Sequence, residues 1–224
     1  MNEIVLLSQL KNPFDEELAK VFVREQYRVF AIGELPVSAG TQVPGVTLLS
    51  SELPEAVALL EKEAGRIDYF LDLADERDKN DTFTVVDGIN REITENIYRE
   101  NVLKPMAMLE AFITLLDKGE GKRLFYLTSA RASINETRDT SGYAYNLSKA
   151  ALHQFLQMVR NKLAPSGYTF RVFDPMNGSI STKDAAEGAY HYIVRKRGSE
   201  RGDPLRNDED NLVFRDAEAR QHAW

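Results

Sequence analysis

The chain has 224 residues, of which 43% are hydrophobic and 9% aromatic, and 35 acidic against 28 basic side chains give it a net charge of −7. This composition excludes wholesale disorder and predicts a single domain over residues 1–224. The acidic balance excludes a general nucleic-acid surface, and no apolar run reaches the roughly 18 residues of a membrane span. The absence of cysteine excludes disulfides, thiolate metal sites and cysteine nucleophiles. Since no signal peptide is recognisable at the start, we expect a cytoplasmic protein.

Apolar runs of strand length alternate with stretches of helical periodicity along the chain. The predicted strands are Ile4–Ser8, Arg28–Gly33, Val46–Ser50, Asp68–Leu73, Arg123–Thr128, Phe170–Asp174 and Asn211–Asp216. The predicted helices are Pro13–Glu25, Glu52–Ala64, Arg91–Leu116, Gly142–Leu163 and Lys183–Arg195. Continuously apolar strands are typical of a parallel sheet that is buried on both faces. The order predicts a doubly wound α/β fold with three layers, helices, sheet and helices.

Two polar connections interrupt this alternation. Glu34–Gly45 contains Pro36, Gly40 and Pro44, so a loop is expected there instead of a helix. Arg195–Asp210 is the most polar segment of the chain, and it fits a solvated connection better than a recognition arm.

The segment Ser141–Phe155 carries the most informative pair of side chains. Tyr145 and Lys149 are four residues apart, so on a helix they share one face. A nearby ammonium favours the phenolate and lowers a phenol pKa from its usual value of about 10, which predicts a general acid/base at Tyr145. The alternative is structural, with the lysine stem covering the tyrosine ring.

Together with the segments around it, this pair makes the chain resemble the short-chain dehydrogenase/reductase family. Tyr145-Asn-Leu-Ser-Lys149 is similar to the family's Tyr-x-x-x-Lys, and Leu127-Thr-Ser129 stands where the family's strand ends in its serine. Asn101 falls at the family's helix asparagine, and Asn177–Thr182 aligns with Pro-Gly-x-x-x-Thr. The resemblance covers most of residues 1–195 and implies a Rossmann-like fold.

The resemblance also implies catalytic roles. Tyr145 would pass a proton to or from a substrate oxygen, while Lys149 would lower the tyrosine pKa and hold the nicotinamide ribose. Ser129 would hydrogen-bond the substrate carbonyl or alcohol, and Asn101 would anchor a proton-relay water. Ser133 competes with Ser129, which is preferred because it ends the strand.

The implied cofactor is NAD or NADP, and its predicted contacts are Ser8, Lys11, Glu34, Ala74, Tyr145, Lys149, Gly178 and Thr182. Glu34 closes the second strand, where a carboxylate accepts from a ribose 2′-hydroxyl and repels a 2′-phosphate, so NAD is slightly preferred.

The cofactor loop departs from the family pattern. Its three glycine positions hold Gln9, Pro13 and Asp15. Asn12 is a good N-cap, while Asp15 and Glu16 place two negative charges where a helix start would otherwise attract phosphate. Further departures are Leu73-Ala74-Asp75 in place of Asn-Ala-Gly, and Thr182 running almost directly into a helix with no room for a long lid.

Three hypotheses follow, and the first is an oxidoreductase acting on a small carbonyl or alcohol. The second is a cofactor-free binding or regulatory protein, and the third is a non-redox enzyme that reuses Ser129 and Tyr145. The resemblance also implies a homo-dimer or homo-tetramer formed through the helices Arg91–Leu116 and Gly142–Leu163, although their apolar stripes also fit a core. The three histidines lack metal-ligand spacing, so no metal site is expected.

Overall fold

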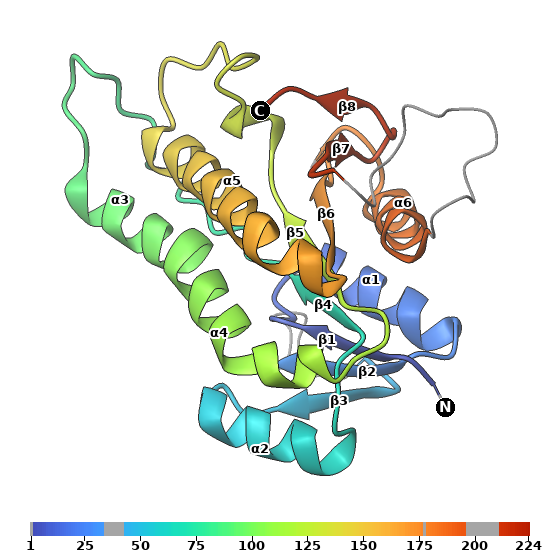
Figure 1. Ribbon diagram of the computed structural model, residues 1–224. Coiled ribbons are helices and arrows are strands. Elements are labelled where there is room, and N and C mark those ends of the chain that lie inside the picture. Colours follow the sequence, from blue (N-terminus) through green and yellow to red (C-terminus); the bar gives the residue numbers. More distant parts are fainter. Residues whose placement is uncertain (1, 34–42, 177, 196–210) are drawn as a thin grey trace.

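The computed structural model describes residues 2–33, 43–176, 178–195 and 211–224. Within these residues eight strands form one sheet in the order β3-β2-β1-β4-β5-β6-β7-β8 (Figure 1). Their bounds are β1 Ile4–Leu7, β2 Arg28–Ile32, β3 Val46–Leu49, β4 Tyr69–Asp72, β5 Arg123–Leu127, β6 Thr169–Asp174, β7 Phe214–Asp216 and β8 Gln221–His222. All neighbouring strands are parallel except β7 and β8. The strand order reverses between β1 and β4, and open α/β sheets bind ligands beside such a switch point.

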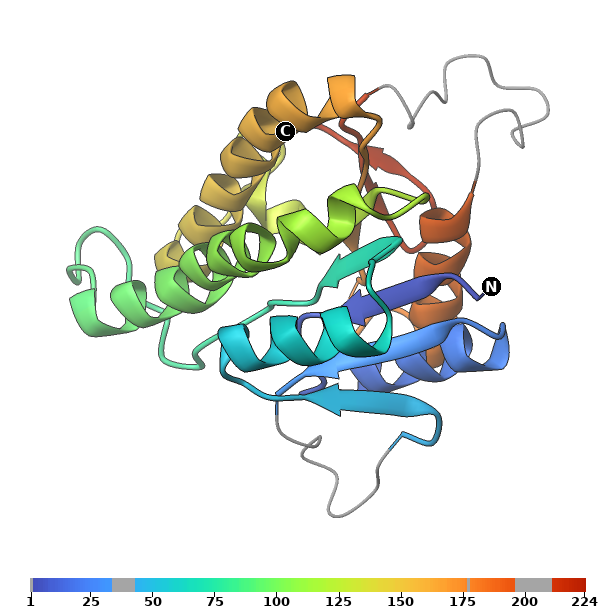
Figure 2. The same cartoon turned by 60° about the horizontal axis from the view of Figure 1, so that its bottom comes forward.

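Helices cover both faces of the sheet, as Figures 1 and 2 show. The α-helices are α1 Pro13–Arg24, α2 Leu53–Glu63, α3 Arg91–Tyr98, α4 Lys104–Asp117, α5 Tyr143–Leu163 and α6 Thr182–Val194. One core cluster joins α2, α4 and α5 to side chains such as Leu6 and Phe70. The second joins α1 and α6 to their neighbours on the opposite face, such as Val5 and Leu71. The residues of β1, β2, β4 and β5 thus alternate between two apolar cores, which is why these runs read as continuously apolar.

The predicted doubly wound fold is confirmed, and the element boundaries differ only in part. The strand predicted over Asn211–Asp216 is shorter, since β7 is Phe214–Asp216, and the two-residue strand β8 was not predicted. The prediction of one helix over Arg91–Leu116 misses a π-helical turn, η1 Arg99–Leu103. Pro105 has no N–H to donate to the carbonyl of Asn101, so the ladder shifts, and the Lys104 N–H bonds to the Arg99 carbonyl instead.

The apolar stripes of the two long helices belong mainly to the core. Met108, Leu109 and Phe112 on α4 and Leu152 and Leu156 on α5 are buried against the sheet. Met106, also part of the predicted stripe, is exposed, as are Leu103, Leu147 and Met158. The structural alternative for the stripe is therefore correct.

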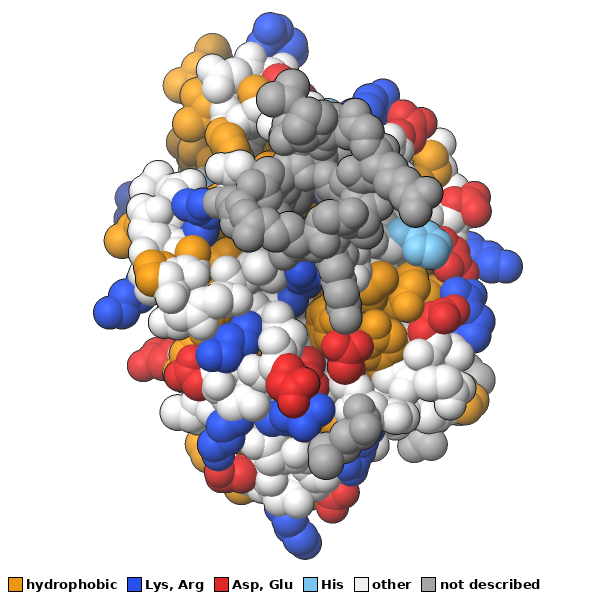
Figure 3. All heavy atoms as spheres, turned by 45° about the vertical axis from the view of Figure 1, so that its right-hand side comes forward, with side chains coloured by type: hydrophobic (Ala, Val, Ile, Leu, Met, Phe, Trp, Pro, Cys, Tyr) orange, Lys and Arg blue, Asp and Glu red, His pale blue; other side chains and the backbone are white. Residues whose placement is uncertain are grey.

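Two further features concern the surface. No helix of the described residues is long and apolar enough to cross a membrane. On the face shown in Figure 3, basic and acidic side chains are interspersed, with hydrophobic side chains reaching the surface between them. The predicted polar segment Arg195–Asp210 lies outside the described residues except for Arg195, as do residues 34–42 of the predicted loop Glu34–Gly45.

Candidate functional site

The first turn of α1 satisfies its own backbone donors. Asn12 caps the helix, and its Oδ1 accepts from the N–H groups of Phe14 (2.9 Å) and Asp15 (3.1 Å). Asp15 Oδ2 accepts from the Lys11 N–H (2.9 Å) and from Gln9 Nε2 (3.4 Å). Because side chains of the same loop take these donors, the start of α1 does not offer them to a phosphate.

Asp15 is buried at this helix start, with an exposed fraction of 0%. Burial raises its carboxyl pKa to about 7, although the hydrogen bonds from Lys11 and Asn12 act in the other direction. Among the described residues its Oδ1 has no hydrogen-bond partner. Burial therefore works against the full negative charge that the sequence suggested for Asp15 at this helix start.

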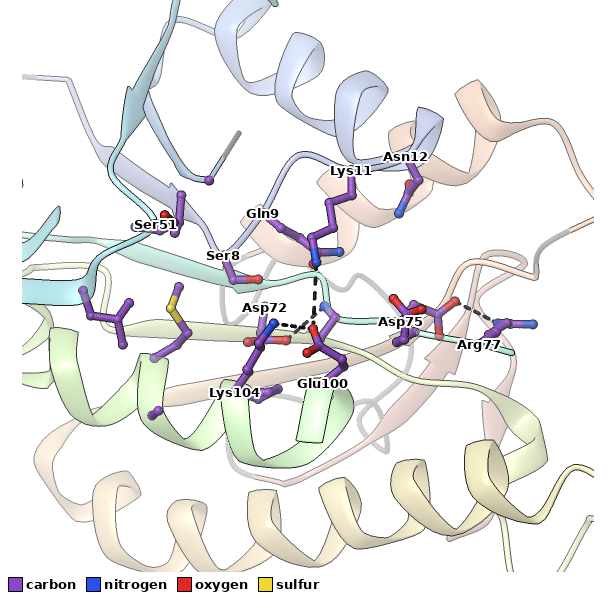
Figure 4. Close-up of a pocket in the computed structure, with 18 residues that line it drawn as sticks. Ser8, Gln9, Lys11, Asn12, Ser51, Asp72, Asp75, Arg77, Glu100 and Lys104 are labelled. Carbon is purple, nitrogen blue, oxygen red and sulfur yellow. Dashed lines mark hydrogen bonds and ion pairs between the residues drawn. The ribbon is translucent and has the colours of Figure 1, made fainter. Parts of the chain in front are cut away.

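A cleft of about 550 Å³ lies at the carboxyl ends of β1, β2 and β4, beside the switch point (Figure 4). Lys11 and Glu100 approach each other across it, with their charged atoms 3.9 Å apart, and Lys104 also pairs with Glu100. Asp72 lies in its wall, where burial raises the carboxyl pKa to about 6. The cleft therefore combines two lysines with a buried acceptor.

Tyr145 and Lys149 lie on the first turns of α5, and both are buried, with exposed fractions of 2% and 0%. Lys149 Nζ donates to the carbonyls of Ala74 and Leu127 at the ends of β4 and β5. The predicted pair therefore meets the sheet where these two strands end.

Asp75, directly after β4, occupies the space between these two side chains. The Tyr145 hydroxyl donates to Asp75 Oδ1 (2.6 Å), and Lys149 Nζ is 3.3 Å from the same oxygen. Arg77 holds the other oxygen, with Nη2 3.0 Å from Oδ2. Burial alone would raise the Asp75 pKa, but Lys149 and Arg77 outweigh it and hold that pKa below its usual value.

These contacts reverse the predicted effect on the phenol. Burial is the largest effect and the Asp75 carboxylate the second, and both raise the pKa of Tyr145 well above 10. Arg77 acts to lower this pKa but does not outweigh them. Burial also lowers the pKa of Lys149, against the pull of Asp75. The expectation of a lowered Tyr145 pKa is therefore not met in this arrangement, because burial and the Asp75 carboxylate dominate the pKa of the hydroxyl.

Arg77 is a site residue that the sequence analysis missed. Its guanidinium lies 4.3 Å from the centre of the Tyr145 ring, and Nη2 donates to the tyrosine hydroxyl (2.8 Å). The signal in the sequence was the acidic Asp75 at a glycine position of the family, with a basic residue two positions later.

The structure places the two remaining predicted catalytic residues nearby. Asn101, in the π-helical turn, donates to the Glu76 carbonyl (2.9 Å) and to Ser148 Oγ (3.0 Å), and accepts from the Glu76 N–H (2.7 Å). Ser129 Oγ accepts from the Arg131 N–H (3.4 Å), and this side chain acts to lower the Tyr145 pKa against the larger effects of burial and Asp75. Its competitor Ser133 accepts from the Glu136 N–H (3.1 Å). Of the two serines, Ser129 is thus the one that acts on the tyrosine pKa.

The predicted cofactor residues divide into three groups. Ser8, Lys11 and Ala74 line the cleft. Gly178, in the connection after β6, and Thr182, the first residue of α6, are exposed and are not part of the cleft wall. Glu34 lies outside the described residues.

Two histidines, His153 and His222, have resolved roles in packing and ion pairing. His153 is buried, and desolvation lowers its pKa to about 3, so it is a neutral packing residue. His222 joins Glu136 to Asp216, with nitrogen–oxygen distances of 2.8 and 2.9 Å. Among the described residues no group of three or more metal-binding side chains is present.

Comparison with solved structures identifies the fold. A protein of Burkholderia multivorans, named as a candidate short-chain alcohol dehydrogenase, matches with a TM-score of 0.79 and 19% identity over 100% of both chains. The carbonyl reductase Sniffer of Drosophila melanogaster matches with a TM-score of 0.78 and 16% identity, also over 100% of both chains. A carbonyl reductase of Pseudomonas aeruginosa, solved in complex with NADP, has a TM-score of 0.76 and 16% identity over the same coverage. The chain therefore has the fold of the short-chain dehydrogenase/reductases, as its motifs indicated.

Curated relatives match over part of the chain. An uncharacterized oxidoreductase of Saccharomyces cerevisiae is 33% identical over 97 residues, which are 43% of this chain and 37% of the relative. The C-signal protein of Myxococcus xanthus is 31% identical over 75 residues, 34% of this chain and 45% of the relative. The chain thus covers less than half the length of these relatives. No protein-family model matches it.

Proposed function

We propose that this protein is an NAD(P)-dependent oxidoreductase of the short-chain dehydrogenase/reductase type, which reduces or oxidises a small carbonyl or alcohol. The observation that carries the proposal is the grouping of Tyr145, Lys149, Ser129 and Asn101 at the carboxyl ends of β4 and β5, next to a cleft at the switch point. The oxidoreductase and carbonyl reductase names of the similar proteins support it.

The cleft fits a dinucleotide by place and size. Its volume is within the range of about 300–1,000 Å³ that is typical of ligand sites. Lys11 and Lys104 are the lysines that could meet phosphates there, and a phosphate would compete with Glu100 for both of them. The start of α1 does not fit a phosphate, because Asn12 and Asp15 take its amide hydrogens. If a dinucleotide binds here, its phosphates are held by lysine side chains rather than by a glycine-rich turn.

A bound nicotinamide would supply or accept a hydride, and the protein's own residues would handle the proton. Because its pKa is raised, Tyr145 keeps its hydroxyl proton at neutral pH and would donate it to a carbonyl oxygen. The Lys149 ammonium would stabilise the phenolate that remains, and Ser129 would orient the substrate oxygen. Asn101 holds the backbone of Glu76, so it acts on the segment beside the site and is a positioning residue.

The test is direct titration with NADH and NADPH, followed by a screen of small carbonyls with the tighter-binding dinucleotide. Retained dinucleotide binding in Tyr145→Phe, together with loss of turnover, would support the role of the phenol. Glu34 is expected to repel the 2′-phosphate of NADPH, so NADH should bind more tightly than NADPH. Tighter binding of NADPH would contradict this role of Glu34.

A second candidate function is a cofactor-free binding protein. The observation that favours it is that the donors of the α1 start and of the Tyr145–Lys149 pair are already bound to Asn12, Asp15 and Asp75. This candidate predicts that neither the wild type nor Asp15→Gly binds either dinucleotide. Binding that appears only in Asp15→Gly would instead identify the buried carboxyl as the group that excludes the cofactor.

We also propose a homo-dimer or homo-tetramer. The exposed apolar side chains Leu103 and Met106 near the start of α4, and Leu147 and Met158 on α5, support a contact along these helices. Light scattering at micromolar protein concentration tests this, and a monomer would contradict it.

A further inference from the structure

Residues 75–81, which we call the strap, cross the site between the cleft and Tyr145. Asp75 and Arg77 line the cleft, whereas none of Tyr145, Lys149 and Ser129 does. The strap therefore forms the wall that separates the cleft from the tyrosine. With an exposed fraction of 2%, Tyr145 is closed to any ligand in this arrangement.

Three sets of contacts hold the strap down. Asp75 accepts from Tyr145 and pairs with Lys149, while Arg77 stacks on the tyrosine ring. In the middle of the strap, the Asn101 side chain binds both the N–H and the carbonyl of Glu76.

The far end of the strap is fixed on α5. The Asp81 carboxylate accepts from the N–H groups of Ala144 (3.2 Å) and Tyr145 (2.9 Å). The N-cap of α5 is Gly142, which has no side chain to do this, so the strap caps the helix from another part of the chain.

In the central contact, the Asp75 carboxylate is bound as a carboxylate ligand would be. The carboxylate accepts a hydrogen bond from the Tyr145 phenol and forms ion pairs with the Lys149 ammonium and the Arg77 guanidinium. These two cations offset its negative charge. The same donors are those that the proposed function needs for a substrate oxygen and for the cofactor. A ligand therefore has to displace Asp75 before it reaches them.

We propose that the strap is an autoinhibitory element in which Asp75 acts as an internal ligand of the Tyr145–Lys149 pair, and that the site becomes competent only when the strap lifts. This inference rests on the proposed function for its ligand, but the closure itself is a property of the chain. If only a small fraction of the molecules is open, the apparent dissociation constant equals that of the open form divided by this fraction.

The experiment compares the wild type with Asp75→Ala and with Asp87→Asn as a matched control. Asp87 is exposed in the same connection and pairs with Thr84, outside the strap. Hydrogen–deuterium exchange of peptides containing residues 76–81 and 143–146 reports opening without any ligand. Titration with NADH and NADPH reports the effect on binding.

We expect exchange in these two peptides to be at least about tenfold faster in Asp75→Ala than in the wild type and the control. We expect the dinucleotide dissociation constant to fall by about tenfold or more. In the wild type, saturating dinucleotide should speed exchange at residues 143–146, because the Asp81 cap is released as the strap lifts.

Different failures separate the two proposals. Unchanged exchange and unchanged affinity in Asp75→Ala would overturn the strap, whether or not the wild type binds a dinucleotide. Faster exchange with no dinucleotide bound by any variant would support the strap and count against the proposed function. If Asp75→Ala does not fold by circular dichroism, Asp75→Asn, which keeps the shape and removes the charge, takes its place under the same criteria.

Discussion

The buried carboxyl of Asp15 makes the most quantitative prediction. Its pKa is about 7 in the folded chain against a usual value of 3.8, and the side chain is fully buried. A raised carboxyl pKa means that the unfolded chain ionises first, so stability is lost as pH rises from about 4 to about 7. We expect Asp15→Asn to remove this loss, because the amide does not ionise.

The size of the effect follows from the pKa difference. A shift of one pKa unit corresponds to about 1.4 kcal/mol, so the full difference is about 4 kcal/mol, of which about 3 kcal/mol falls between pH 4.5 and pH 8. The free energy of unfolding of Asp15→Asn minus that of the wild type should therefore rise by about 3 kcal/mol over this range.

Urea unfolding followed by circular dichroism at several pH values measures this difference. Asp72 and His222 also make the free energy of unfolding depend on pH, because their pKa values are raised. Both residues are present in the wild type and in Asp15→Asn, so their contributions cancel in the difference. A difference that changes by less than about 1 kcal/mol across the range would refute the reasoning, because Asp15 would then ionise as it does in water.

Three other predictions concern single side chains. Tyr145→Phe should lower kcat by at least about 100-fold, measured with the best substrate of the screen. It should not weaken dinucleotide binding, because loss of the hydroxyl bond to Asp75 loosens the strap. Arg171→Met should cost roughly 2–4 kcal/mol in urea unfolding, because the buried guanidinium donates to the carbonyls of Phe170, Tyr192 and Arg195; a smaller loss would mean that water replaces those bonds. His222 has a raised pKa through Glu136 and Asp216, so its stabilisation is complete below pH 6.5 and is lost as pH rises. His222→Gln should therefore cost more stability at pH 6 than at pH 9, and an equal cost at both would contradict the paired histidinium.

The fold could be predicted because each buried strand carries its own signal. Runs such as Ile4–Leu7 and Arg123–Leu127 are apolar on both faces, so no register information is needed to recognise them. The π-helical turn around Asn101 could not be placed in the same way, because its cause is the missing donor of Pro105, and a proline in the first turn is equally compatible with a regular helix start.

The candidate site could be predicted only as a set of residues. Tyr145, Lys149 and Ser129 do gather, since the strands β4 and β5 end beside the start of α5. The sequence marked Asp75 as a departure from the family pattern, but it did not indicate where the carboxylate points. Seventy residues separate Asp75 from Tyr145, and the contact depends on how the chain turns after β4. For that reason the direction of the tyrosine pKa shift could not be predicted from the sequence.

Titration of the wild type with NADH and NADPH, followed by nicotinamide fluorescence, tests the central claim most directly. Saturable binding of at least one dinucleotide below about 1 mM, weakened by Lys149→Met, is the predicted result. No binding of either dinucleotide by the wild type, by Asp15→Gly or by Asp75→Ala would contradict the claim that this site uses a nicotinamide cofactor.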